Sequence, residues 1–262
     1  MSVLSYLEEV ASALVLSSAE KLSIALSVST LESRLEDYDE NHDIKTKYIF
    51  GSYERGTILP RTYDSESDVD YMVVFNDPFR VQPQSRLDWL KGFARNKYSR
   101  SEVHQDYPTI ALELSHIRFE LVPAVEMGSS FNLQIPAPKS LFLQWINTNP
   151  FQLAQQTNNA NIRMGFKFKP LVRILKLWNV NNGRIFSSFQ LEQFLGQLVF
   201  GGSNLEEYLY YAVKYLPTFG LSESEKKKVD CLKSQVALAK SFHDLRSESA
   251  AEAIINGLFP IG

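Results

Sequence analysis

Two aspartates stand immediately before a short apolar run, in the stretch Ser-Asp-Val-Asp-Tyr-Met-Val-Val-Phe at residues 67–75. In an extended segment, side chains two positions apart project from the same face, so Asp68 and Asp70 would point to one place. Two carboxylates held that close repel each other, and in proteins a bound divalent cation usually offsets this repulsion. The apolar run predicts a buried strand over 71–75, so the pair belongs at the entrance of a strand. A solvated turn is the alternative, because the preceding residues are polar.

A Gly-Ser pair lies upstream, after a second predicted strand at residues 47–50. The segment 51–57 reads Gly-Ser-Tyr-Glu-Arg-Gly-Thr. A Gly-Ser turn that leads into a helix presents backbone N–H groups and a hydroxyl, which together bind phosphate well. Gly51 and Ser52 are therefore candidate phosphate contacts. The alternative is that the glycines only form turns.

A third carboxylate is expected from a neighbouring strand, because a two-metal site needs a shared set of ligands. Residues 108–125 alternate apolar and polar positions around a central polar pair, which predicts a hairpin whose second arm ends at Pro123. The first arm carries Glu113 and the second carries Glu120 between two apolar residues. Burying Glu120 without a cationic partner would be costly, so it is the predicted third ligand. An outward-facing position on an edge strand is the alternative.

The hydrophobic periodicity divides the chain into a mixed front and a helical back. A helix is predicted over residues 17–39, where Ser17 and Glu20 have the spacing of a capping box. We expect an α+β chain with a catalytic lobe at 1–135 and a helical, nucleotide-binding lobe at 136–262. Within the second lobe, helical character is expected to begin at about residues 141–145.

The helical back supplies a second group of candidates. Lys176 lies in a predicted helix that also carries Lys167, Lys169 and Arg173, and Ser188 and Phe189 begin the next one. A lysine and a helix-start serine could bind the β- and γ-phosphates, and a phenylalanine could stack on a base. Each also has an ordinary alternative: a solvated lysine, a helix cap and a core phenylalanine.

Composition narrows the classes of protein further. The net charge is −3 with a single cysteine, Cys231, so an internal disulfide is excluded and a general attraction to nucleic acid is disfavoured. No Cys/His cluster has zinc spacing, so any metal must be bound by oxygen. We expect no membrane helix, because no apolar run reaches the roughly 20 residues that one needs, and the N-terminus lacks the basic charge of a secretory signal. We expect a cytoplasmic protein without a membrane partner.

These motifs resemble those of a known family. The strings Gly-Ser-Tyr-Glu-Arg-Gly-Thr, Ser-Asp-Val-Asp-Tyr-Met-Val-Val-Phe and Phe-Glu-Leu-Val-Pro-Ala (119–124) are similar to the polymerase-β-type nucleotidyltransferase signature. In the back half, the segments 145–150, 173–179, 187–192 and 253–260 resemble the bacterial cyclic-oligonucleotide synthases, the CD-NTase family, which are relatives of animal cyclic GMP-AMP synthase and oligoadenylate synthase. The resemblance spans roughly residues 45 to 260.

The resemblance implies a bilobal fold with a central cleft and assigns roles to residues. Asp68, Asp70 and Glu120 would hold Mg²⁺ or Mn²⁺ and carry catalysis, and the nucleotide-binding residues would be Gly51, Ser52, Lys176, Ser188 and Phe189. Two positions depart from the usual pattern. The third acid is a glutamate rather than an aspartate, and Phe189 stands where relatives often have a tyrosine, so it lacks a hydroxyl.

The implied function is condensation of nucleoside triphosphates, ATP among them, into a cyclic or linear oligonucleotide, with release of pyrophosphate. The product would activate a downstream effector in bacterial antiviral defence (CBASS), and a regulatory protein or RNA could act as activator. One alternative is a toxin-like nucleotidyltransferase that modifies an RNA end or a protein, for which the basic residues 167–176 could form the acceptor surface. The other is an inactive nucleotide-binding sensor module, against which the intact acid pair argues.

Overall fold

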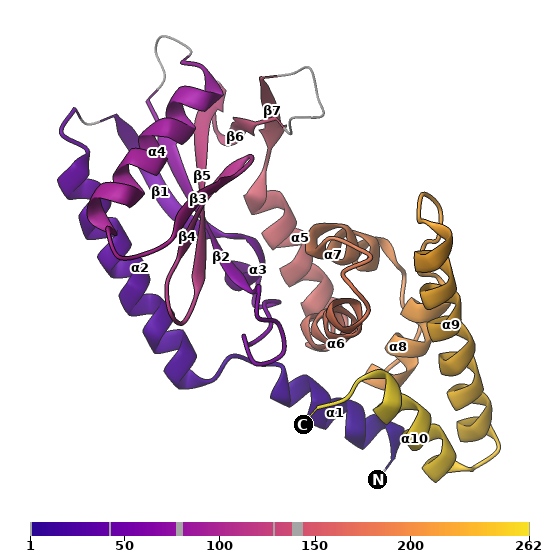
Figure 1. Cartoon of the computed structure of the whole chain (residues 1–262). Helices are drawn as coiled ribbons and strands as arrows, with labels where there is room; N and C mark the ends of the chain where they lie inside the picture. The colour runs from indigo at the N-terminus through magenta and orange to yellow at the C-terminus, as the bar shows by residue number, and fades with distance from the viewer. Residues whose placement is uncertain (1, 42, 77–80, 128, 138–143, 262) are drawn as a thin grey trace. The chain divides into compact units, whose positions relative to one another are not determined.

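The computed structural model describes residues 2–41, 43–76, 81–127, 129–137 and 144–261 (Figure 1). Contacts within the chain divide it into two compact units, which are described separately below. Unit 1 consists of Met1–Val15, Thr62–Asp64 and Gln155–Gly262, and unit 2 consists of Leu16–Arg61 and Ser65–Ala154. The fold class is α+β, as expected, because unit 2 is built on a mixed sheet and unit 1 on helices.

Among the described residues, unit 2 contains a seven-stranded sheet whose main path runs β1-β2-β5-β4-β3, with β6 joined to β5 and β7 joined to β6. Strand β2 pairs in parallel with β5, and the other described pairings are antiparallel. The bounds are β1 (Ile44–Phe50), β2 (Asp68–Phe75), β3 (Val103–Asp106), β4 (Thr109–Glu113), β5 (Arg118–Met127), β6 (Ser129–Pro136) and β7 (Trp145–Thr148).

Helices α2 (Ser18–Tyr38) and α4 (Pro83–Lys97) cover one face of this sheet (Figure 1). Alternate residues of β2, from Val69 to Phe75, pack against them in the main core, together with Phe119 of β5. The intervening residues of β2 project from the other face, where Met72 belongs to a smaller apolar cluster. The predicted helix at 17–39 is confirmed, and Ser17 and Glu20 form the expected capping box.

The predicted hairpin is confirmed, since β4 and β5 pair as antiparallel neighbours. Its expected end at Pro123 is wrong, because β5 continues to Met127. The pairing of β5 with β4 stops at Leu121 and its pairing with β6 starts at Val125, so Pro123 lies in the gap between them. A proline is tolerated there because it need not donate an N–H to the ladder.

The expected boundary at 135/136 differs from the observed division. The sheet extends past it through β6 and β7, so unit 2 reaches Ala154. Trp145 begins strand β7 rather than ending a helix, because it pairs with Pro136 of β6. The rest of the helix expected over 141–145 includes residues 141–143, which lie outside the described residues. The first 15 residues group with the helices of the C-terminal half rather than with the sheet.

Unit 1 gathers helices from both ends of the chain. Helix α1 contacts α6, α8 and α10, and the Tyr6 hydroxyl donates a hydrogen bond to the carbonyl of Phe259 at 2.9 Å. Helix α5 begins at the end of unit 2 and continues into unit 1. The bounds are α1 (Val3–Ala13), α5 (Pro150–Arg163), α6 (Phe168–Asn181), α7 (Ser188–Gln197), α8 (Leu205–Lys214), α9 (Glu223–Asp244) and α10 (Glu248–Leu258).

One stretch of described residues, Val3–Tyr38, is long and apolar enough to cross a membrane by length and composition alone. The stretch consists of α1 and α2, between which Ser17 caps the second helix. Val3 and Leu7 of α1 are fully buried against other parts of the protein. Composition is therefore weak support for a membrane span here.

Candidate active site

The sheet of unit 2 brings the three predicted acids to one place. Asp68 and Asp70 occupy the first and third positions of β2 and project from the face that α2 and α4 leave open. Strand β5 runs parallel beside β2, with Asp70 aligned with Glu120. Aligned residues of paired strands project from the same face, so Glu120 joins the aspartates. All three carboxylates are half-buried.

The Gly-Ser turn packs directly against this pair. Gly51 begins the short helix α3 (Gly51–Arg55) with a φ of +74°, a conformation that favours glycine. A Cβ atom placed on Gly51 would lie 1.7 Å from Oδ2 of Asp70. The Ser52 carbonyl accepts the N–H groups of Thr57 at 2.9 Å and Ile58 at 3.1 Å, which closes the loop behind the turn. Glycine is thus required at position 51 by the close approach of a predicted metal ligand.

Glu120 has an unusual electrostatic setting. Burial, followed by the negative charge of Asp68, raises the pKa of Glu120 to about 7, although Arg118 opposes the shift. The two carboxyl groups of Asp68 and Glu120 are within hydrogen-bonding distance, which also favours a shared proton. Two acids whose negative charges repel each other in this way are also a pair that a cation would stabilise.

Arg118 was not predicted from the sequence. Its Nη2 lies 3.0 Å from Oε1 of Glu120 and 2.8 Å from Oδ2 of Asp106, and its Nε lies 3.6 Å from Oε1 of Glu113. The alternating pattern of β5 could have placed Arg118 beside Glu120, because residues 118 and 120 share a face of the strand. Arg118 therefore partly neutralises the third acid and holds its side chain in place.

The residues fit a hard divalent cation. Mg²⁺ prefers carboxylate oxygen, and the half-buried acids 68, 70 and 120 offer only such donors. Within the part of the chain that the structure describes, no three His, Cys, Asp or Glu side chains are already gathered as a metal-binding group. The pairing of Glu120 with Arg118 is the feature in which this arrangement departs from a closed three-carboxylate group.

The candidates in the helical back belong to unit 1. Lys176 of α6 is only 4% exposed, and its Nζ donates to Oε1 of Glu192 of α7 at 2.7 Å. Ser187, not Ser188, caps α7, so capping does not occupy the exposed Ser188 hydroxyl. Phe189 is 52% exposed, which rules out the core alternative. These positions keep Ser188 and Phe189 as candidates but give no support to a direct phosphate contact by Lys176.

The expected basic stripe at 167–176 is not an exposed surface. Arg173 is buried together with Lys176, and burial lowers the pKa of Arg173 to about 10. Lys167 and Lys169 are half-buried. A charged stripe must reach solvent to contact a phosphate backbone. The residues 167–176 therefore do not support an RNA acceptor surface.

Comparison with solved structures shows the fold. The chain is similar to Escherichia coli MS115-1 CdnC in complex with ATP, with a TM-score of 0.72, 16% identity and 98% of both chains covered. It is equally similar to Bradyrhizobium diazoefficiens CD-NTase CdnG in complex with GTP, with a TM-score of 0.72, 13% identity and 98% of both chains covered. The Vibrio cholerae DncV cyclic AMP-GMP synthase matches with a TM-score of 0.65 and 14% identity, over 82% of this chain and 69% of DncV.

Sequence comparison shows the family. A curated relative, the cyclic AMP-AMP-AMP synthase of Acinetobacter sp. (strain ATCC 27244 / 9458), is 25% identical over 159 residues, which are 59% of this chain and 45% of the relative. The match thus spans less than half of that protein. A family model for the Second Messenger Oligonucleotide or Dinucleotide Synthetase domain matches residues 1–161, a range that includes all three predicted acids and the Gly-Ser turn. The chain therefore belongs to the Second Messenger Oligonucleotide or Dinucleotide Synthetase family.

Proposed function

We propose that this chain is a metal-dependent nucleotidyltransferase that condenses nucleoside triphosphates into a cyclic or linear oligonucleotide and releases pyrophosphate. The observation that carries the proposal is the arrangement at the head of β2. There Asp68 and Asp70 share a face with Glu120, and Gly51 packs against Asp70. Family membership supports the same reaction. Two of the relatives are a cyclic AMP-AMP-AMP synthase and a cyclic AMP-GMP synthase, which supports purine nucleotides as substrates.

In the proposed reaction, the oxygen of an acceptor hydroxyl forms a bond to the α-phosphorus of a donor triphosphate. The bond from that phosphorus to the bridging oxygen of the β-phosphate breaks, and pyrophosphate leaves with the electron pair. Bound Mg²⁺ or Mn²⁺ would acidify the hydroxyl and neutralise the triphosphate. Asp68 and Asp70 would hold the metal, and Glu120 would complete the ligand set. The acceptor oxygen is itself the nucleophile, so no protein nucleophile is needed, and its proton passes to solvent.

The remaining candidates divide by the contacts they make. Gly51 and Ser52 lie beside the acids and would contact the triphosphate. Phe189 would stack on a base, because its ring is exposed and base–aromatic stacking tolerates any base. Ser188 would donate its hydroxyl to phosphate. Lys176 would act indirectly, since its pair with Glu192 joins α6 to the helix that begins at Ser188.

We also propose that the product is a signal. In this family such nucleotides activate an effector in antiviral defence, and the enzyme would act in the cytoplasm, where nucleoside triphosphates are made. One neighbour was solved with a HORMA-deltaN partner, which supports a regulatory protein as a possible class of activator. The acidic net charge of −3 favours small substrates over a long nucleic acid.

The test is incubation of the purified chain with each radiolabelled nucleoside triphosphate and Mg²⁺ or Mn²⁺, with phosphatase treatment before chromatography. We expect a phosphatase-resistant product that disappears in the Asp70→Asn variant, while the melting temperature changes little. Glu126→Gln is the matched control, because Glu126 lies on the same strand as Glu120 but pairs with Lys45 away from the acids. A product of equal yield from Asp70→Asn would contradict the assignment.

A further inference from the structure

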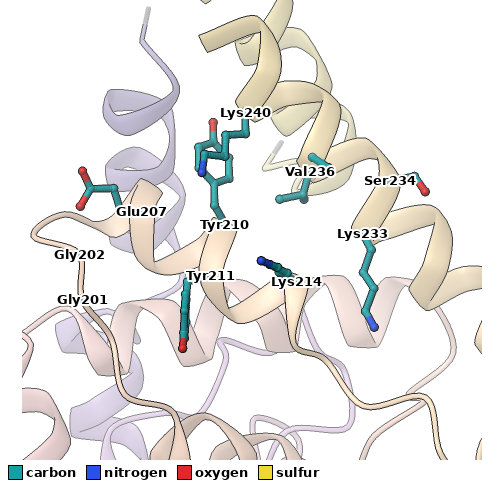
Figure 2. Close-up of a pocket in the computed structure, with 11 residues that line it drawn as sticks. Gly201, Gly202, Glu207, Tyr210, Tyr211, Lys214, Lys233, Ser234, Val236 and Lys240 are labelled. Carbon is teal, nitrogen blue, oxygen red and sulfur yellow. The ribbon is translucent and has the colours of Figure 1, made fainter. Parts of the chain in front are cut away.

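A pocket lies in unit 1, between α8 and α9 and beside the glycine loop at residues 201–202. Its volume is about 680 Å³. None of the residues proposed for catalysis or substrate binding lines it. Figure 2 shows Tyr211 and Lys214 from α8, and Lys233, Val236 and Lys240 from α9, around this space.

The pocket is basic, although the chain as a whole is acidic. Lys214 ends α8, and Lys233 and Lys240 lie seven residues apart on α9, which places them two turns and about 10 Å apart on one face. Among the described residues, none of these three lysines has a carboxylate partner. The one acid that lines the pocket, Glu207, accepts the backbone N–H of Ser203 at 2.7 Å. Three cations against one engaged carboxylate favour an anionic ligand.

The wall between the lysines is apolar and aromatic. Val236 lies on α9 three residues after Lys233 and is buried at the base of the pocket. The Tyr211 ring is half-buried and lies 5.5 Å from the ring of Phe200 and 4.8 Å from that of Tyr215, measured between centroids. These contacts fix the ring, so that stacking on it costs little conformational entropy. A ligand that fits must therefore combine negative charge with a flat, apolar body.

We propose that the α8–α9 pocket binds a nucleoside polyphosphate at a site separate from the metal-binding acids. The base would stack on Tyr211, and the phosphates would contact Lys214, Lys233 and Lys240. Sequence-tolerant stacking on an aromatic ring and charge-assisted hydrogen bonds to phosphate are the interactions that such a ligand makes in proteins. A volume of about 680 Å³ lies in the range of small-molecule sites, which favours a nucleotide over a protein segment.

The site goes beyond the proposed function and is tested without catalysis. Binding of ATP is measured by calorimetry in EDTA, on the Asp70→Asn background, so that the metal-dependent site does not contribute. We expect one ATP per chain, with an affinity that the double variant Lys233→Ala/Lys240→Ala lowers by about tenfold or more. The matched control is Lys21→Ala/Lys227→Ala, which removes two exposed lysines outside the pocket and should leave the affinity unchanged.

Two further probes test the shape of the site. Tripolyphosphate should bind more weakly than ATP, because it lacks a ring to stack on Tyr211. Tyr211→Ala should weaken ATP but not tripolyphosphate, and Tyr211→Phe should bind ATP normally. The proposal is overturned by the absence of ATP binding in EDTA, by equal losses in the pocket and control variants, or by tripolyphosphate binding as tightly as ATP. Tighter binding of a glutamate-rich peptide than of ATP would also overturn it, in favour of an acidic protein segment.

Discussion

Replacing Gly51 with alanine should separate the requirements of the fold from those of catalysis. The added Cβ would stand 1.7 Å from Oδ2 of Asp70, whereas such atoms do not approach closer than 3.0 Å, so the carboxylate must retreat by at least 3.0 − 1.7 = 1.3 Å. Metal–ligand distances tolerate a change of about 0.2 Å, and a misplacement of about 1 Å can cost about 100-fold in rate. We therefore expect the rate of pyrophosphate release to fall by about 100-fold or more.

The Gly51→Ala variant should lose less in folding stability than it loses in catalytic rate. Alanine at the left-handed φ of +74° costs about 1–2 kcal/mol. For a chain of this size, that corresponds to a fall in melting temperature of roughly 2–8 °C. Stability is followed by circular dichroism and the rate by pyrophosphate release at saturating Mg²⁺.

The control is Gly196→Ala. Gly196 lies in α7, and a Cβ there meets nothing within 4 Å. Alanine is favoured over glycine in a helix by up to about 1 kcal/mol, so this variant should be as stable as the parent or more so, with full activity. Parental activity in Gly51→Ala would refute the reasoning, because it would mean that Asp70 need not stay where the turn places it.

Three further predictions follow from the described contacts. Lys176→Met should lower the free energy of unfolding, measured in urea, by about 3–5 kcal/mol, because the buried Glu192 loses its ion pair with Lys176. Lys176→Met/Glu192→Leu should recover most of this loss, and equal losses in the two variants would contradict the pairing argument. In EDTA, the pKa of Glu120 is near 7 when folded and near 4.5 when unfolded, so its stabilising contribution is complete below pH 4.5 and is lost as the pH rises through 7. Melting temperatures measured from pH 4 to 8 should show this fall. The fall should be smaller in Glu120→Gln than in the control Glu126→Gln, and Mg²⁺ should raise the melting temperature of the parent more at pH 8 than at pH 5. A parental melting temperature that does not change with pH would argue against the shared proton. Phe189→Ala should raise KM for the nucleoside triphosphate by about tenfold at unchanged melting temperature, and Phe189→Tyr should not; an unchanged KM in Phe189→Ala would remove the stacking role.

Residues that act through strand alternation were predictable from the sequence. The spacing of Asp68 and Asp70 placed both on one face of a strand, and the hairpin pattern placed Glu120 on a neighbouring strand. Arg118 could have been identified by the same alternation. What the pattern did not contain was the partner of each side chain, because Asp106 and Glu113 reach Arg118 from other strands.

Side-chain burial in the helices was less predictable. Lys176 looked like a cleft-facing cation, but its partner Glu192 lies 16 residues away on another helix, and no local pattern joins the two. The sheet extended further than expected because β7 is short, and its pairing depends on β6 rather than on its own periodicity. Long-range pairing therefore accounts for the differences in both units.

The interleaving of the two units has a consequence for how such a protein can be cut or recombined. The chain passes between the units at 15/16, 61/62, 64/65 and 154/155. No single cut therefore releases either unit whole: a fragment that starts at residue 16 lacks α1, which packs in unit 1, and one that ends at residue 61 lacks most of the sheet. One crossover between related genes would likewise exchange parts of both units, so exchanging the sheet alone or the helices alone would take several crossovers.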